Sequence, residues 1–491
     1  MIRTTTGLRR LLATAAIGAV LVMPQQAAAA SLRFVDATAS AGLPVNDATS
    51  WGSTIADIDG DGWPDVLLNR HTQPPVLYTG GPGGFSELAL PWPAPMDRHN
   101  CAWGEANGDG RPDLFCAQGT LSSTGEGPNE LWLNLPDGFV ESADAYGLSR
   151  SLERGRTATW IDYDRDGDLD MFLGSAPLSG HPDVMMRNDR GVFVETTTGI
   201  EGERDSESAT WADWDGNGYP DLLITTGAGR AIAFSNDAGA FTQTTIPALG
   251  TRHWLGSMWG DFNGDGRPDL AVIDPRYVRI LRNDGGGAFT TVRNTSVGLG
   301  RSVVWVDLNN DGRLDLYLVL SARGEDPGSV GDHRDLLLMA TKRGTFDVVK
   351  PDELSGWEGN GDGASVLDFN HDLRMDVLVS SGRARWPGQP VLLQNVFATK
   401  HAAAVRLRGP AWNPLGMGAV VELRTSNFTY RRQLNDGVAW NGQSDVGFVH
   451  LGLRGLTAGV ARVTWPDGTL DCVAVAAETV VELQFGTSPC P

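Results

Sequence analysis

The chain has 491 residues and carries 60 Asp and Glu against 39 Lys and Arg, so its formal net charge is −21. Hydrophobic residues make up 41%, which supports a packed core and excludes a wholly disordered chain. The acidity argues against a nucleic-acid-binding protein, because phosphate contacts need clustered Lys and Arg. An ordinary domain has roughly 100–200 residues, so the length indicates several domains or one repeat architecture. The 62 glycines predict many tight turns between short strands.

Residues 1–30 read as a secretory signal peptide. Three arginines near the start are followed by the uncharged apolar run Leu11–Met23 and by Ala27–Ala30, which predicts cleavage before Ser31. The alternative is a membrane anchor, but the run is shorter than the roughly 20 residues that a membrane span needs. We therefore expect a protein that is secreted, or periplasmic or at the cell surface, with no transmembrane segment after signal removal.

The chain has four cysteines, and an even number in an exported protein allows two disulfides. Among the three pairings, sequence proximity favours Cys101 with Cys116 and Cys472 with Cys490. The alternative is four buried free thiols.

An acidic decapeptide occurs seven times, with 46 to 61 residues from one copy to the next. Seven copies in series cannot arise by chance, so the chain is built of repeats. The copies are DIDGDGWPDV from Asp57, EANGDGRPDL from Glu105, DYDRDGDLDM from Asp162, DWDGNGYPDL from Asp213, DFNGDGRPDL from Asp261, DLNNDGRLDL from Asp307 and DFNHDLRMDV from Asp368.

A phenylalanine, usually after a glycine, precedes each decapeptide by 18 to 23 residues. These residues are Phe34, Phe85, Phe139, Phe193, Phe241, Phe289 and Phe346. No such phenylalanine follows the seventh decapeptide, so the last repeat lacks the strand that carries it. The N-terminal strand at Phe34 should supply that strand and thereby close a ring. The sequence thus predicts an all-β fold, a seven-bladed β-propeller over residues 31–398.

Short β-rich runs follow each decapeptide, and Trp-containing apolar runs such as TATW from Thr157 and SATW from Ser208 precede most of them. There is no sustained helical periodicity, so we expect little helix. The recurring tryptophans should pack between neighbouring blades, although an aromatic platform for a sugar is the alternative.

The decapeptide has the chemistry of a calcium loop. Carboxylates or Asn amides occupy positions 1, 3 and 5, an Asp occupies position 9, and position 7 would offer a backbone carbonyl. Ca²⁺ takes six to eight oxygen ligands, and oxygen-only ligation disfavours zinc. Glycine at position 6 allows a positive φ. The predicted metal ligands are Asp57, Asp59, Asp61, Trp63, Asp65, Glu105, Asn107, Asp109, Arg111, Asp113, Asp162, Asp164, Asp166, Asp168, Asp170, Asp213, Asp215, Asn217, Tyr219, Asp221, Asp261, Asn263, Asp265, Arg267, Asp269, Asp307, Asn309, Asp311, Arg313, Asp315, Asp368, Asn370, Asp372 and Asp376.

Two rival interpretations exist. An EF-hand needs a Glu at position 12 and flanking helices, but position 12 is Leu68, Cys116, Leu173, Ile224, Val272, Leu318 or Val379. The loops could also be plain Asp/Asn/Gly turns, yet Asp at position 9 in all seven copies favours up to seven Ca²⁺. The seventh loop has Leu373 in place of glycine, so we expect it to bind weakly or not at all.

The loops also account for much of the acidity. Their positions 1, 3, 5 and 9 hold 23 of the 60 acidic residues. Removing residues 1–30 takes away three arginines and no acid, which changes the charge from −21 to −24, and seven Ca²⁺ would bring it to −10. Without calcium the loops should repel one another, so calcium should stabilise the fold.

The D-x-[DN]-x-D-G-x-x-D-[LV] string, with the Gly-x-Phe marker between copies, resembles the FG-GAP/VCBS repeat family, which includes integrin-α propellers. The resemblance covers residues 31–396 and implies a calcium-binding, seven-bladed propeller.

The repeat stops near residue 399, and strand-like runs follow over residues 399–491, with WPDGT from Trp465 reading as a hairpin turn. The order GMGAVVEL, GFVHLGL, VTWPDGT resembles the ASPIC/UnbV domain of cartilage acidic protein-like proteins and bacterial exported proteins. VHLGLRG departs from that domain's usual F-G-L-G pattern. The resemblance implies no established chemistry.

No H-x-x-x-H pair, G-x-S-x-G elbow or phosphate loop occurs in the chain. The leading hypothesis is therefore an exported scaffold that binds extracellular protein, matrix or carbohydrate without catalysis. The alternative is a calcium-dependent lyase or hydrolase that acts on a polysaccharide at the propeller face. Tyr430-Arg431-Arg432 reads as a strand face or as an anionic contact. The Arg9-Arg10 pair resembles a twin-arginine export signal, which is typical of bacteria, so the sequons at Asn294 and Asn427 should stay unused.

Overall fold

The structure is a computed structural model. It describes residue 1 and residues 33–43, 50–70, 73–92, 97–119, 127–150, 155–175, 181–202, 205–298, 300–320, 335–349, 361–383, 386–387, 389–397, 401–434 and 442–491. Leu32–Pro491 is one compact unit, separate from Met1–Ser31. Apart from Met1, the predicted signal peptide lies outside the described residues.

Seven sheets follow one another along the chain, and each has a core of antiparallel strands that are close in sequence, which confirms the predicted β-propeller. Blade 1 contains β2 (Gly52–Ala56), β3 (Asp65–Asn69), β4 (Val76–Thr79) and β5 (Ser86–Leu88); blade 2 contains β6 (Arg98–Gly104), β7 (Asp113–Gln118), β8 (Glu130–Leu135) and β9 (Gly138–Glu141). Blade 3 contains β10 (Gly155–Ile161), β11 (Asp170–Ser175), β12 (Val184–Asn188) and β13 (Phe193–Thr196); blade 4 contains β14 (Ser206–Ala212), β15 (Asp221–Thr226), β16 (Ala231–Asp237) and β17 (Ala240–Thr244).

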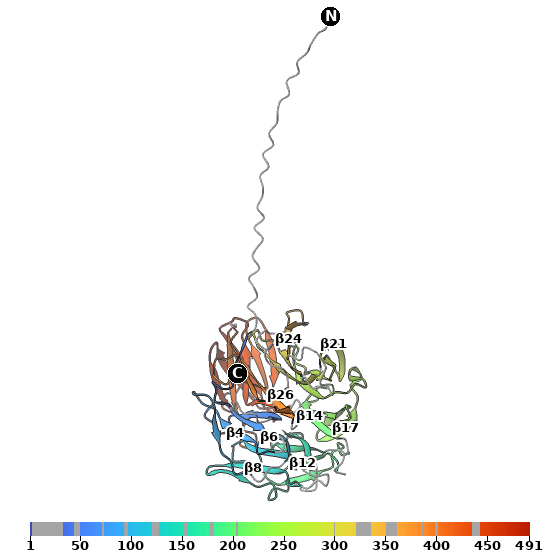
Figure 1. Ribbon diagram of the computed structural model, residues 1–491, viewed down its shortest axis with the longest axis vertical. Coiled ribbons are helices and arrows are strands. Elements are labelled where there is room, and N and C mark those ends of the chain that lie inside the picture. Colours follow the sequence, from blue (N-terminus) through green and yellow to red (C-terminus); the bar gives the residue numbers. More distant parts are fainter. Residues whose placement is uncertain are drawn as a thin grey trace. The chain divides into compact units, whose positions relative to one another are not determined.

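The remaining blades follow the same order. Blade 5 contains β18 (Gly256–Gly260), β19 (Asp269–Ile273), β20 (Tyr277–Gly285) and β21 (Ala288–Ser296); blade 6 contains β22 (Gly300–Val306), β23 (Asp315–Leu320), β24 (Leu336–Ala340) and β25 (Phe346–Val349). Blade 7 contains β26 (Gly361–Leu367), β27 (Asp376–Arg383), β29 (Val391–Asn395) and β1 (Phe34–Asp36), and β28 (Trp386–Pro387) pairs with β27. Figure 1 shows inner strands β6, β14 and β26 near the middle of the ring and outermost strands such as β17 and β21 farther out.

The N-terminal strand completes the last blade, as the position of Phe34 predicts. β1 pairs antiparallel with β29, with Phe34 opposite Asn395 and Asp36 opposite Leu393. Phe34 is 1% exposed and packs in the core of blades 6 and 7. The seventh blade is therefore made from both ends of the repeat region.

Side chains of the inner strands link each blade to the next. The indole N–H of Trp160 donates to the carbonyl of Ala102 at 3.2 Å, and that of Trp211 donates to Thr159 at 2.8 Å. Ser53 of blade 1 and Ser365 of blade 7 are hydrogen-bonded at 2.9 Å, so the last blade meets the first. The tryptophans thus pack between blades, as expected, and each lies about 6 Å from the marker phenylalanine of its blade in the pairs Trp103–Phe139, Trp160–Phe193, Trp211–Phe241, Trp259–Phe289 and Trp305–Phe346.

The C-terminal residues form two further sheets and one inserted strand. One sheet has the order β34-β30-β37 and the other β32-β31-β35-β36. The inserted strand β33 pairs in parallel with β2, the inner strand of blade 1. The bounds are β30 (Ala402–Arg408), β31 (Val420–Arg424), β32 (Thr429–Gln433), β33 (Gly442–Val446), β34 (Phe448–Gly452), β35 (Ala458–Thr464), β36 (Leu470–Ala476) and β37 (Val480–Gln484).

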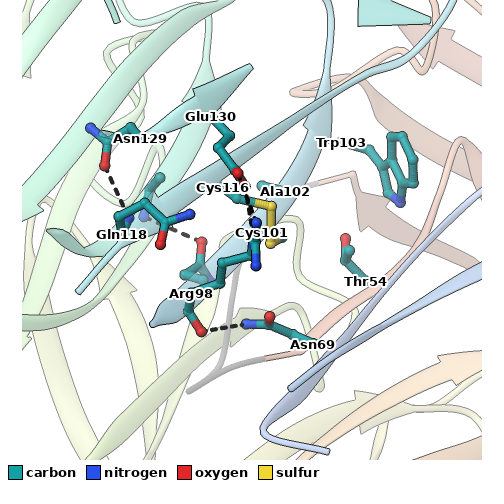
Figure 2. Close-up of a disulfide and its surroundings, with 12 residues drawn as sticks. Thr54, Asn69, Arg98, Cys101, Ala102, Trp103, Cys116, Gln118, Asn129 and Glu130 are labelled. Atoms are coloured by element: carbon teal, nitrogen blue, oxygen red, sulfur yellow. Dashed lines mark hydrogen bonds and ion pairs between the residues drawn. A yellow bond between two sulfur atoms is a disulfide. The ribbon is translucent and has the colours of Figure 1, made fainter. Parts of the chain in front are cut away.

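Both predicted disulfides are present. Cys101 and Cys116 lie opposite each other on β6 and β7, and Cys472 on β36 is joined to Cys490. Figure 2 shows the first bridge beside the buried ion pair of Arg98 and Glu130, whose Nε and Oε2 are 2.6 Å apart. The bridge and the ion pair both connect strands within blade 2.

Helix is nearly absent, as the lack of helical periodicity predicts. Across the described ranges the single helix is one 3-10 turn, Pro247–Leu249. None of the described residues belong to a helix that could cross a membrane.

Candidate metal centres

All seven decapeptides connect the inner strand of a blade to its second strand, and we number them loop 1 to loop 7 after their blades. Position 1 directly follows the inner strand, and position 9 begins the second strand, as Asp65 begins β3 and Asp376 begins β27. Every predicted metal ligand therefore lies at the same end of its blade. The residue before position 1 pairs with position 9 in each blade, as Ala56 pairs with Asp65, so the sheet register sets the width of each loop.

The aspartate at position 9 joins its loop to two strands. In loop 1 the Oδ2 of Asp65 accepts the N–H of Ile58 and its Oδ1 accepts the N–H of Gly80, both at 2.8 Å. The same two kinds of bond occur in the other six loops. These aspartates are fully buried, and burial raises the pKa of Asp65 to about 8. A buried carboxylate of this kind is stabilised in its charged form by a nearby cation.

Positions 3 and 5 fold the loop on itself. In each loop the N–H of position 5 donates to the side-chain oxygen of position 3, and the N–H of position 7 donates to that of position 5. In six loops the N–H of position 6 donates to the carboxylate of position 1. The exception is loop 3. These turns aim the oxygens of positions 1, 3 and 5 toward one side of the loop.

Two backbone positions need a positive φ, and the sequence analysis identified one of them. Position 6 has φ from 74° to 100° where it is glycine, and Leu373 takes φ 57° there, so loop 7 keeps the shape of the others. Position 4 is also left-handed, as in Gly60 at φ 79° and His371 at φ 56°. The sequence did contain a signal for this second position. Position 4 is glycine in four loops and Asn310 in loop 6, and these residue types adopt a positive φ most readily.

The loops fall into two groups. In loops 1, 3 and 4, three carboxylates place oxygens within 4.8 Å of one another; they are Asp57, Asp59 and Asp61, then Asp162, Asp164 and Asp170, then Asp213, Asp215 and Asp221. Loops 2, 5, 6 and 7 instead have Asn at position 3 and Arg at position 7. That arginine pairs with the position-5 aspartate, as Arg313 pairs with Asp311 and Arg111 with Asp109. The arginine therefore neutralises the position-5 carboxylate, whose negative charge would otherwise attract a metal ion.

Loop 3 fits a cation best. Both carboxylate oxygens of Asp162 are buried without a close hydrogen bond, and the backbone N–H groups of Arg165 and Gly167 interact with them only loosely. Burial, with the charges of Asp166 and Asp164, raises the pKa of Asp162 to about 7. In loop 1 the Oδ1 of Asp57 is likewise buried without a partner. A buried carboxylate without a partner is costly, and oxygen donors at this spacing are those that Ca²⁺ prefers.

A second set of residues, which the sequence analysis missed, links loops of adjacent blades. The amide of Asn236 on β16 donates to the carbonyl of Tyr163 in loop 3 at 2.8 Å, and its Oδ1 accepts the N–H of Gly239. Asn134, Asn283 and Asn395 donate in the same way to the position-2 carbonyl of the preceding loop. An Asn at the end of the third strand, often followed by Asp-x-Gly, was the signal in the sequence.

The C-terminal strands lie against the loops and enclose a cavity. The cavity has about 360 Å³ and is bounded by Asp162 and Asp213 of loops 3 and 4, Trp259, Arg431 and Pro466, among others. The volume falls in the range of small-molecule sites.

The FG-GAP-like repeat model matches residues 57–116, 105–173, 213–272 and 261–318. No curated protein sequence matches the chain. A solved structure on specific recognition of non-reducing terminal N-acetylglucosamine by an Agrocybe aegerita lectin has a TM-score of 0.43 and 17% identity, over 68% of this chain and 86% of that chain. Two structures of BBS1N in complex with ARL6DN, soaked with mercury and with lead, both have TM-scores of 0.45, over 71% of this chain and 92% of theirs, with 9% and 10% identity.

The four matched repeats cover loops 1 to 6, and the inner-strand, loop and second-strand pattern that they describe recurs in every blade. The chain therefore contains FG-GAP-like repeats.

Proposed function

We propose that this protein is an exported, calcium-binding β-propeller scaffold that binds an extracellular protein, a matrix component or a carbohydrate and has no catalytic activity of its own. The observation that carries the calcium proposal is the cluster of Asp162, Asp164 and Asp170, whose oxygens lie within 4.8 Å of one another while both buried oxygens of Asp162 lack a close hydrogen bond. We assign residues 399–491 to a separate domain of the ASPIC/UnbV type, following residues 31–398 of the propeller.

The two groups of loops should differ in calcium affinity. Loops 1, 3 and 4 offer a three-carboxylate cluster, whereas the position-7 arginine neutralises one carboxylate in loops 2, 5, 6 and 7. A positive charge beside the site opposes a divalent cation. We therefore expect loops 3 and 4 to bind calcium most tightly and loops 2, 5, 6 and 7 most weakly. Loop 1 should lie between them, because Arg408 pairs with its Asp57 at 2.9 Å.

Two features support the extracellular binding role. The two disulfides fit an oxidising compartment. The 360 Å³ cavity combines aromatic, arginine and carboxylate side chains, which are groups that hold a polar ligand.

The first experiment is metal analysis by mass spectrometry, paired with thermal melts in calcium and after calcium removal. We expect at least three calcium ions per chain and a clear drop in melting temperature without calcium. Zero or one ion with unchanged melting would reject the calcium proposal.

A matched pair of variants locates the strongest site. Asp162→Asn should remove one ion per chain, because the amide is neutral and nearly isosteric. Glu87→Gln, at an exposed residue of β5 outside the loops, should leave the metal content unchanged. Binding to immobilised glycans and to extracellular matrix proteins, compared with and without calcium, then tests the scaffold role, and turnover of a glycan would replace it with the enzyme hypothesis.

A further inference from the structure

The C-terminal sheets contact four loops at the same atom. A side-chain donor reaches the backbone carbonyl of position 6 in loops 1, 5, 6 and 7. The pairs are Arg406 Nη2 to Gly62 at 2.8 Å, Arg431 Nη1 to Gly266 at 3.4 Å, Arg432 Nη2 to Gly312 at 3.3 Å and His450 Nε2 to Leu373 at 3.2 Å. The four donors come from three strands, β30, β32 and β34, which belong to two sheets. The same contact therefore recurs because the loops repeat around the ring, and not because donors are regularly spaced along one strand.

His450 shows that hydrogen bonding, not charge, is the shared element. It is buried, and burial lowers the pKa of His450 to about 4, so it is neutral at physiological pH. A carbonyl can only accept, so Nε2 carries the proton in this bond.

The bonded peptide also contacts a predicted calcium ligand. The peptide that provides the position-6 carbonyl provides the N–H of position 7, which donates to the position-5 carboxylate. In loop 6 the Arg313 N–H is 3.1 Å from Asp311 Oδ1, and in loop 7 the Arg374 N–H is 2.9 Å from Asp372 Oδ1. A donor on the carbonyl polarises the peptide and strengthens its N–H as a donor. Each C-terminal donor is thus one peptide group away from a predicted ligand.

Further contacts close the same interface. Arg408 Nη2 lies 2.9 Å from Asp57 Oδ2 in loop 1, while Oδ1 of Asp57 stays without a partner. At loop 6 the backbone of Gly452 runs so close that a Cβ on it would lie 2.1 Å from Asp307 Oδ2. Within the described parts of the chain, no hydrogen bond from residues 401–491 reaches loop 3 or loop 4. Loops 3 and 4 therefore serve as internal controls.

Charge does not explain why an arginine faces a predicted calcium loop. Loop 6 carries three acids, Asp307, Asp311 and Asp315, so one Ca²⁺ and its own Arg313 already bring its net charge to zero, and Arg432 acts on the loop through its hydrogen bond to the position-6 carbonyl, as the neutral His450 does in loop 7. Arg432 attracts Asp307, whose buried carboxyl has a pKa of about 6, raised by burial and by Asp311 and lowered by Arg432.

We propose that Arg406, Arg431, Arg432 and His450 are positioning residues for calcium in loops 1, 5, 6 and 7. By fixing the position-6 peptide, the C-terminal sheets hold the position-5 carboxylate in place for the ion, so docking of these sheets and calcium binding stabilise each other. Groups that orient metal ligands commonly change metal affinity by 10- to 100-fold. This inference rests on the calcium binding proposed above.

The first test uses amide hydrogen exchange on the full chain with calcium. Asp307→Asn in loop 6 should speed exchange in β32 and β34 by about fivefold or more, a typical coupling between linked sites. Asp162→Asn in loop 3, to which the described residues of the C-terminal sheets make no hydrogen bond, should leave these strands unchanged. Equal exchange in the two variants, each having lost one ion by mass spectrometry, would overturn the coupling. Retention of every ion in both variants would instead reject calcium binding itself.

The reverse direction uses His450. His450→Ala removes the donor to Leu373 and should weaken the calcium affinity of loop 7 by about tenfold or more. His450→Gln keeps a neutral N–H donor and should restore most of that affinity, even if both variants lose stability. Gly452→Ala, whose methyl would meet Asp307, should weaken loop 6 and leave loop 3 unchanged. Equal affinities in the alanine and glutamine variants of His450 would overturn the positioning role.

Discussion

The indole of Trp63 lies flat on the imidazole of His371, with 3.6 Å between ring centroids and 5° between ring planes. Trp63 is position 7 of loop 1, and His371 is position 4 of loop 7, so the stack joins the first and last blades. At the rim of the same blade 7, β1 pairs with β29. The ring is therefore closed twice by noncovalent contacts, once by strand pairing and once between loops.

Replacing Trp63 with alanine should lower the free energy of unfolding by about 2 kcal/mol. The stack contributes roughly 0.5–1.5 kcal/mol beyond the apolar area that it buries, and the half-buried ring loses part of its transfer free energy. Urea unfolding followed by circular dichroism measures the change. Trp63→Phe keeps an aromatic face on His371 and should lose less than half as much; equal losses in the two variants would show that the stack contributes nothing.

Much of the fold follows from the repeat alone. The number of blades, the closing strand at Phe34 and both disulfides could be predicted, because each depends on residues close in sequence or on counting units. The shared conformation of the seven loops was also accessible, because positions 1 to 9 form hydrogen bonds among themselves, whereas their role as metal ligands stays a prediction.

The features that the sequence did not reveal depend on distant segments. Gln443 on β33 accepts hydrogen bonds from Thr54 and from the N–H of Trp103, more than 300 residues away. No local sequence pattern predicts that the C-terminal strand β33 pairs with β2 and extends the sheet of blade 1. The arginine at position 7 was visible, but its pairing with position 5 requires the folded turn.

The asparagine that joins blades should be important for stability. Asn236 is fully buried, and its side chain makes three hydrogen bonds, to Tyr163, Pro220 and Gly239. Asn236→Ala leaves two carbonyls and one N–H without that partner, and each buried unsatisfied group costs about 1–3 kcal/mol. We expect a loss of about 3 kcal/mol in chemical denaturation. A loss below 1 kcal/mol, comparable to an exposed control such as Glu87→Gln, would contradict the role of this residue.

At Leu373, backbone strain lowers the stability of the folded protein and side-chain burial raises it. Its left-handed backbone, at φ 57°, costs about 1–2 kcal/mol relative to glycine. Its side chain is 4% exposed and packs in the core of blades 6 and 7, where truncation of a leucine costs about 2–5 kcal/mol. The burial effect is larger, so Leu373→Gly should destabilise the protein by about 1–3 kcal/mol in spite of the relieved strain. A variant more stable than the parent in thermal melts would show that strain dominates.

Calcium-free protein should become less stable as the pH rises from 5 to 8. Burial raises the pKa of Asp269 to about 8 and that of Asp221 to about 7, far above the ordinary value of 3.8. The folded state then binds more protons than the unfolded state, so this stabilisation is complete below pH 4 and is lost as the pH rises through 7 to 8. Calcium needs the charged carboxylates, so saturating calcium should flatten or reverse the slope. Thermal melts of metal-stripped and calcium-loaded protein across this pH range measure both. Asp269→Asn should make the unfolding free energy of the metal-stripped protein less dependent on pH, by up to about 1.4 kcal/mol per pH unit, which is the effect of one proton. A metal-stripped protein that instead gains stability between pH 5 and 8 would show that these carboxyls are ionised in the folded state without calcium.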